Sequence, residues 1–250
     1  MIGGDRGSGK GVKLMSANIS RRKFLITLSS LLSLSTIIPS FVVRAFGMGK
    51  MPRFEGIHSI VGEVYVNGQK AKVGDLIKKG DVITTGKNSS AIFASGTSAF
   101  LVRDNSRIEF PEMSADNTII SDHLIGTIHI VRGKLLSVFG SGNRKVITTT
   151  AVIGVRGTGI YIETEEERTY LCTCYGVVDI EAKRAPGVIK TVKTRHHEAP
   201  FYINGGIEGF PFTKAKVINH TDKELIMLEA LVGRQPPFYN PFNIEEENVY

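Results

Sequence analysis

Short runs of alternating apolar residues, cut at close intervals by glycine-containing turns, fill this chain from Ile60 onward. Alternation with a period of two is typical of strands with one buried face, and frequent glycine turns are typical of antiparallel connections. The clearest hairpin is Val64–Val66 followed by Asn67 and Gly68, since such a pair adopts the positive φ values of a type I′ turn. Because exposed strand edges must be covered, we expect an all-β fold, a compact two-sheet roll or sandwich of many short strands.

Turn residues divide this region into individual strands. We expect turns at Arg132-Gly133-Lys134 and at Gly140-Ser141-Gly142-Asn143, among others. Beside the first hairpin, the strands expected between the turns are Val82–Thr85, Ser90–Ala94, Ala99–Val102, Arg107–Phe110, Gly126–Val131, Lys134–Phe139, Val146–Ile153 and Gly159–Thr164.

One later segment carries the signals of a helix. Thr221 is suited to cap its N-terminus, Glu224 completes a capping box, and Gly233 supplies the left-handed stop. We therefore expect a helix over about residues 222–232, with an apolar face that packs on the sheet or docks a partner.

Charge separates the first 45 residues from the rest of the chain. The sequence has 31 basic and 24 acidic residues, and seven of the basic residues but only one acidic residue lie in positions 1–45. Positions 46–250 thus hold 24 basic and 23 acidic residues. A nearly neutral body gives no compositional sign of the basic face that binding to nucleic acid requires, so we exclude that class.

Residues 26–43 form an uncharged apolar stretch with a basic flank. The preceding six residues resemble the twin-arginine export signal, and Val43-Arg44-Ala45 resembles a cleavage site. This resemblance implies a bacterial protein that the twin-arginine export machinery carries, already folded, to the periplasm. An uncleaved stretch of this length would instead anchor the chain in the membrane. The residues that match the signal are Ser20, Arg21, Arg22, Phe24 and Leu25.

A longer series of motifs covers about residues 60–165. It comprises a G-x-V-x-V-N-G segment from Gly62, a G-x-x-L-x-x-G-D-x-I-x-T-like segment from Gly74, and a closing T-x-x-A-x-x-G-V-R-G-T-like segment that ends at Thr158. In this order the segments resemble the FecR-domain family. The residues that carry the resemblance are Asn67, Gly68, Gly80, Asp81, Gly86, Arg156, Gly157 and Thr158.

The best-known FecR-domain proteins are inner-membrane relays that respond to outer-membrane ferric-siderophore transporters and control a sigma factor through a cytoplasmic N-terminal segment. Here only 19 residues precede the twin-arginine motif, too few to fold an anti-sigma module. The resemblance therefore implies an exported, non-catalytic module that binds or senses a ligand or a periplasmic or envelope protein. A membrane-anchored signal relay of the iron-transport-regulator type, a thiol/His metal-binding protein and an unrecognised enzyme remain as alternatives.

These features together divide the chain into three parts. We expect a twin-arginine signal peptide at residues 1–45, a FecR-like β domain at residues 46–184, and a C-terminal extension with the helix at residues 185–250.

Cys172 and Cys174 lie two residues apart in a predicted strand, which puts both thiols on one face. Their Cβ atoms would be roughly 6.5 to 7 Å apart, whereas a disulfide requires roughly 4 Å, so a bridge needs a kinked backbone. The thiols are then buried packing residues, redox-active groups, or ligands of zinc or another soft metal ion.

Two histidines, His196 and His197, follow Cys174 closely enough for a return strand to bring an imidazole to the thiols. Thiolates and imidazoles together form tetrahedral sites for zinc or another soft metal ion. Neighbouring residues on a strand point to opposite faces, which hinders both rings from reaching one ion. The candidate metal site from the sequence is thus Cys172, Cys174, His196 and His197.

Catalytic motifs are absent from the sequence. It contains neither G-x-S-x-G nor H-E-x-x-H, so no catalytic residue is predicted. Arg156 to Gly159 resembles a phosphate-binding loop only superficially, because an apolar strand pattern and not a helix follows it. We expect a structural corner there, in which the Arg156 guanidinium binds a carboxylate or neighbouring carbonyls.

Overall fold

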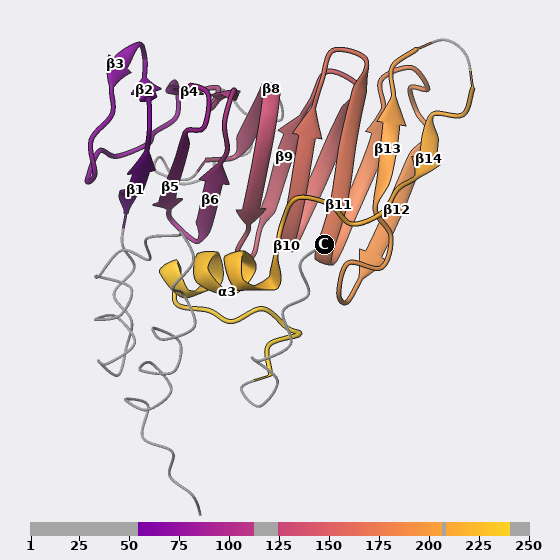
Figure 1. Cartoon of the computed structure of the whole chain (residues 1–250). Coiled ribbons are helices and arrows are strands. Elements are labelled where there is room, and N and C mark those ends of the chain that lie inside the picture. The colour runs from indigo at the N-terminus through magenta and orange to yellow at the C-terminus, as the bar shows by residue number, and fades with distance from the viewer. Residues whose placement is uncertain (1–54, 113–124, 207–208, 241–250) are drawn as a thin grey trace, which may run out of the picture. The chain divides into compact units, whose positions relative to one another are not determined.

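The computed structural model describes residues 55–112, 125–206 and 209–240. Strands dominate these ranges, and helix α3 (Asp222–Leu231) lies across one end of the sheet that they form (Figure 1). The all-β prediction is therefore confirmed. The expected export signal at residues 1–45 lies outside the described residues. Within them, no helix has the length and apolar character needed to cross a membrane.

Hydrogen bonds join the described strands into one sheet of 14 strands. In chain order they are β1 (Gly56–Val61), β2 (Val64–Val66), β3 (Gln69–Lys70), β4 (Val82–Thr85), β5 (Ser90–Ser95), β6 (Ser98–Val102), β7 (Arg107–Glu109), β8 (Thr127–Val138), β9 (Asn143–Ile147), β10 (Ala151–Thr164), β11 (Arg168–Ala182), β12 (Ile189–Thr194), β13 (Phe201–Asn204) and β14 (Phe212–Lys214).

Three long strands, β8, β10 and β11, make this sheet branch. The first half of β8 pairs with β7 and its second half pairs with β6. Similarly, β10 pairs first with β9 and then with β8, and β11 pairs with β13 and then with β12. The shorter strands therefore diverge from shared long strands. One branched sheet results, where the sequence pattern led us to expect two sheets.

The strands that diverge from β8, with β6 on one branch and β7 on the other, enclose a common apolar core. Phe93 on β5, Phe100 on β6 and Phe110 after β7 are all buried. The Phe93 ring stacks on Phe100 at 4.7 Å between centroids and meets Phe110 edge-on at 5.8 Å. Aromatic pairs of this geometry add to the stabilisation from burial alone, so they fix the two branches face to face.

The turn expected at Gly133 is instead continuous strand inside β8, directly after an irregularity in the pairing of β8 with β7. Gly133 has a φ of +97°, and a Cβ there would lie 2.2 Å from Oγ of Ser106. Glycine is thus required both by the backbone conformation and by the close approach of Ser106, the residue before β7. The two strands predicted on either side of this glycine are one continuous strand.

Strand β10 contains a bulge but continues in the same direction beyond it. The pairing of β10 with β11 shifts between Arg156 and Gly159, and Gly157 has a φ of +57°. The strand predicted at Gly159–Thr164 is therefore the second half of β10, and the strand predicted at Val146–Ile153 is divided between β9 and β10. The first difference comes from the glycine with positive φ inside β10, and the second comes from a bend at residues 149–150, which contains no glycine.

Helix α3 begins where its cap predicts. The Thr221 side chain accepts a hydrogen bond from Glu224 N, and the Glu224 side chain accepts one from Thr221 N at 2.9 Å. At the other end Gly233 has a φ of +75°. The capping box and the left-handed glycine are both confirmed: the box fixes the start of the helix at Asp222, and the glycine follows the C-cap residue Val232.

Candidate metal centre

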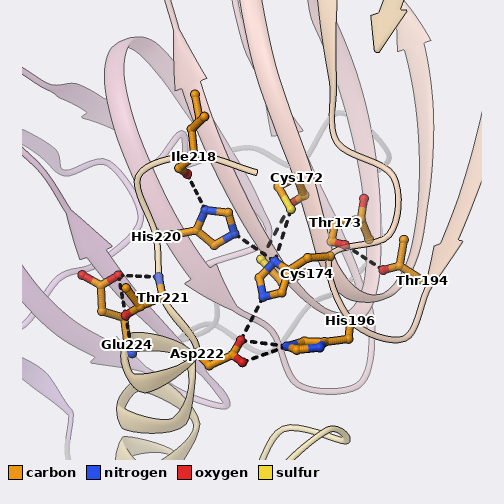
Figure 2. Close-up of polar contacts among 11 residues, drawn as sticks. Cys172, Thr173, Cys174, Thr194, His196, Ile218, His220, Thr221, Asp222 and Glu224 are labelled. Carbon is orange, nitrogen blue, oxygen red and sulfur yellow. Dashed lines mark hydrogen bonds and ion pairs between the residues drawn. The ribbon is translucent and has the colours of Figure 1, made fainter. Parts of the chain in front are cut away.

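Strand β11 places two thiols side by side inside the protein. Cys172 and Cys174 are both free cysteines with an exposed fraction of 0%. They are two residues apart on a strand that is paired along its length with β10, with Cys172 opposite Tyr161. Their sulfur atoms lie within 4.8 Å of each other (Figure 2). The spacing thus presents two soft ligand atoms to the same point.

The loop after β12 brings His197 to these thiols. His197 N donates to Cys174 O at 2.9 Å, and Thr194 Oγ1 donates to Thr173 O at 2.7 Å. His197 has a φ of +52°, a conformation uncommon for residues other than glycine and concentrated at functional sites. This turn directs its Nδ1 to within 3.4 Å of Cys172 Sγ.

His220, just before helix α3, completes the group from the opposite side. Its Nε2 lies 3.0 Å from Nδ1 of His197, and the side chain is 1% exposed. Its Nδ1 lies 2.6 Å from Ile218 O, and its ring stacks on Tyr161 at 4.6 Å between centroids. The Ile218 carbonyl fixes the tautomer of His220 (Figure 2), and Tyr161 fixes the plane of the ring.

The four ligand atoms of Cys172, Cys174, His197 and His220 all lie within 4.8 Å of one another. We call this group the Cys2His2 cluster. Two sulfurs and two imidazole nitrogens are the donor set of a tetrahedral zinc site. Each imidazole also has its other nitrogen fixed, in His197 by Asp222 Oδ1 at 3.0 Å and in His220 by Ile218 O. Such outer partners orient the ligands of metal centres, so the donor set fits a metal ion.

The cluster is electrostatically prepared for a cation. A hydrogen bond with Cys174 lowers the pKa of the Cys172 thiol against the opposing effect of burial, and His197 and His220 lower it further. Burial, and then the same bond with Cys172, raise the pKa of Cys174. Cys172 is therefore the more acidic of the two thiols, and an ion that binds here displaces the proton of Cys174 and any proton on Nδ1 of His197.

The ionisation of His197 and Asp222 also favours a positive charge in the cluster. Burial opposes protonation of His197, yet hydrogen bonds with Asp222 and then Cys172 raise its pKa to about 9. Burial likewise acts against ionisation of Asp222, but its bonds with His197 and His196 lower its pKa below the ordinary value. A positive charge is thus favoured at the centre of the cluster, between a thiolate and a carboxylate.

The structure separates the two histidines that the sequence paired. His196 does not join the thiols, because residues 195–197 form a bend and not a strand. Its Nε2 instead lies 2.8 Å from Asp222 Oδ2, its ring packs on Phe238 at 4.4 Å, and its side chain is 34% exposed. His196 therefore helps to hold Asp222, which in turn holds His197.

Sequence reasoning missed His220. It follows Cys174 by 46 residues, and no local spacing connects the two. The only signal is its position directly before a well-marked helix cap, which shows where the residue lies along the chain but not what it faces.

Five of the eight matched residues of the family resemblance, Asn67, Gly68, Gly80, Asp81 and Gly86, lie in or beside the turns that flank β2, β3 and β4. Asn67 Nδ2 donates to Asp81 Oδ1 at 2.7 Å, and Asn67 Oδ1 accepts from Val82 N at 2.9 Å. Gly80 has a φ of +88°, and Gly86 N donates to Glu63 O at 2.9 Å. Asn67 and Gly68 also both have positive φ, as a type I′ hairpin requires. The contacts of these residues hold the turns in place and so build the fold.

The Arg156 corner has the structural character that we expected. Arg156 binds Asp179 on β11 at 2.5 Å. The Thr158 hydroxyl lies 2.8 Å from Arg156 O and 3.0 Å from Val177 O, and Thr158 is fully buried. The guanidinium and the hydroxyl thus stabilise the bulge in β10, and a strand and not a helix follows it.

No family model and no curated protein matches the sequence. Two crystal structures of a protein from Parabacteroides distasonis ATCC 8503, provisionally described as an anti-sigma factor, resemble the fold with TM-scores of 0.42 and sequence identities of 11% and 12%. Each match covers 54% of this chain and 59% of that protein. A likeness this distant does not identify a function.

Proposed function

We propose that this chain is a non-catalytic binding module of the FecR type that holds one zinc ion in the Cys2His2 cluster. The observation that carries the proposal is the convergence of four ligand atoms, two sulfurs and two imidazole nitrogens, within 4.8 Å of one another. Two soft thiolates with two imidazoles favour zinc over the oxygen-preferring calcium and magnesium ions.

Burial supports a bound ion over simple packing. Small buried cysteines are common in cores, but buried polar histidines need partners. His197 and His220 are 6% and 1% exposed; Asp222 and Ile218 O hold the outer nitrogen of each ring, and the inner nitrogens face each other beside the Cys172 thiol. An ion that accepts all four lone pairs satisfies these groups at once.

The wider role in this proposal is sensing or partner binding in the periplasm. It is motivated by the resemblance to the FecR-domain family and by the twin-arginine motif at Arg21 and Arg22. Export of a folded protein preserves an ion that was loaded in the cytoplasm. The partner is then a periplasmic or envelope protein, reached by a module whose metal ion is already in place.

Cobalt substitution tests the site directly. Tetrahedral cobalt bound to two thiolates absorbs in the visible and near-ultraviolet regions, so titration of the metal-free protein with Co²⁺ is expected to develop both bands and to saturate at about one ion per chain. Cys172→Ser and Cys174→Ser should each weaken the sulfur band. The surface variant His129→Ala serves as the control, because His129 lies near Glu109 and outside the cluster. Octahedral cobalt spectra in the wild type would contradict the proposal.

A second candidate is a cysteine nucleophile. Cys172 Sγ lies 3.4 Å from His197 Nδ1, and His197 Nε2 lies 3.0 Å from Asp222 Oδ1, which is the order of a thiol, a base and an orienting carboxylate. Against this candidate, Cys172 has an exposed fraction of 0%. Iodoacetamide should therefore leave Cys172 unmodified in the native protein as purified, whereas rapid modification at neutral pH would favour the enzyme.

A further inference from the structure

The ligands of the Cys2His2 cluster come from two separate parts of the chain. Cys172 and Cys174 belong to β11, and His197 is tied to the same strand through its own backbone. His220 belongs to the segment that leads into helix α3, which lies across the end of the sheet (Figure 1). An ion held by all four residues would therefore connect the sheet to the start of the helix.

His220 is placed where it can control the first turn of α3. It directly precedes the N-cap residue Thr221, and Asp222 is the first residue of the helix. Asp222 also accepts hydrogen bonds from the two histidines of the bend, His196 and His197. Every one of these contacts crosses from the sheet to the beginning of the helix, so the position of the ion and the position of the first turn depend on each other.

Apart from the cluster and the buried Leu225, the polar attachments of α3 are weak at this end and strong at the opposite end. Near the start, Arg103 binds Glu224 at 2.7 Å, but both side chains are partly exposed, and such ion pairs contribute little. Near the end, the buried Glu229 binds Arg234 at 2.6 Å, and Arg234 binds Thr97 O at 2.6 Å. A helix of ten residues is not stable alone, so the first turn depends on its contacts with the sheet.

Resting on the proposed function, we propose that metal occupancy of the Cys2His2 cluster latches the first turn of α3 onto the sheet, and that loss of the ion releases it. Leu225 and Leu228, both fully buried, are the apolar side chains that release would uncover. Since ion binding and helix docking share His220, each strengthens the other by the same factor. Loss of the ion thereby exposes the apolar surface of Leu225 and Leu228, and binding of the ion covers it again.

Hydrogen exchange of the full chain, with bound zinc and after removal of zinc by a chelator, tests this latch. Chelation should accelerate exchange of the Leu225–Leu228 amides by roughly tenfold or more, because these amides bond to the first turn. The amides of Leu135 and Leu136 in β8 should not change. If chelation removes one ion per chain and leaves exchange in α3 unaltered, the latch is overturned and the metal site stands. If the wild type binds no ion, the metal site itself fails.

Variants of His220 separate the latch from metal binding. His220→Ala keeps three ligands and should still bind zinc, more weakly, while exchange at Leu225–Leu228 becomes fast and independent of zinc. His220→Cys restores a fourth ligand on the helix side and should recover zinc-dependent protection. The surface variant His129→Ala should behave as the wild type. Zinc-dependent protection of α3 in His220→Ala that equals the wild-type effect would overturn the latch.

Discussion

His197 is the residue on which the cluster depends most. It occupies a left-handed backbone conformation, with one ring nitrogen toward Cys172 and His220 and the other toward Asp222. Such a conformation persists in a residue with a side chain only where the surroundings hold it. The bond from His197 N to Cys174 O is one part of that hold. A single residue thereby ties the loop after β12, strand β11 and helix α3 together.

Tyr175 provides a prediction at the same scale. Burial, and then the negative charge of Glu229, raise the pKa of Tyr175 above its ordinary value of 10.0. Because the folded-state pKa is the higher one, this stabilisation is fully present below about pH 10 and is lost as the pH rises further. Urea unfolding between about pH 8 and about pH 11 should show a smaller loss of unfolding free energy in Tyr175→Phe than in the wild type. Equal losses would contradict the assignment.

Single residues also explain which parts of the fold the sequence predicts. The Asn67-Gly68 hairpin and the Thr221 cap depend only on neighbours along the chain, so their signals are local. The need for glycine at position 133 depends on Ser106, which another part of the chain brings against it. No local pattern distinguishes that glycine from one in a turn.

Among the elements, strand β8 is the one that most needs its glycine. A Cβ at Gly133 would lie 2.2 Å from Ser106 Oγ and 2.5 Å from Ser106 Cα, at a φ of +97°. We expect Gly133→Ala to lower the free energy of unfolding by about 3 kcal/mol or more, through strain and overpacking. Gly68→Ala is the matched control, since Gly68 has a φ of +79° but no atom within 4 Å of the added Cβ. It should cost about 1 kcal/mol.

Denaturant unfolding of the two variants measures this difference. An equal loss in both would mean that backbone conformation alone, and not the contact of β8 with Ser106, requires the glycine.

In the candidate site, too, the sequence predicts what depends on local pattern and misses what depends on contacts between distant parts of the chain. The strand pattern predicts that Cys172 and Cys174 face one side, and the close return of the chain predicts a histidine beside them. It does not predict which histidine, because a bend at residues 195–197 replaces the expected strand. His220 comes from the far end of the fold, and only the docking of helix α3 brings it to the thiols.

At the scale of the whole molecule, export and metal loading are linked in the proposed account. Replacing Arg21 and Arg22 with lysine should leave the precursor in the cytoplasm, because the twin-arginine machinery reads the guanidinium pair. Fractionation of cells followed by immunoblotting measures the distribution. Arg44→Lys, which lies outside the motif, should not alter it. Normal periplasmic accumulation of the double variant would contradict twin-arginine export.

The central claim is that the Cys2His2 cluster holds a metal ion, and elemental analysis combined with thermal unfolding tests it most directly. Purified full-length protein should contain about one zinc ion per chain, and a chelator should lower its Tm by about 10 °C or more, because a structural zinc ion contributes roughly 10 kcal/mol to folding. Cys174→Ser should contain little zinc, and a chelator should not affect its Tm. Wild-type protein with less than one ion per several chains and a chelator-insensitive Tm would contradict the claim and leave the four residues as core packing.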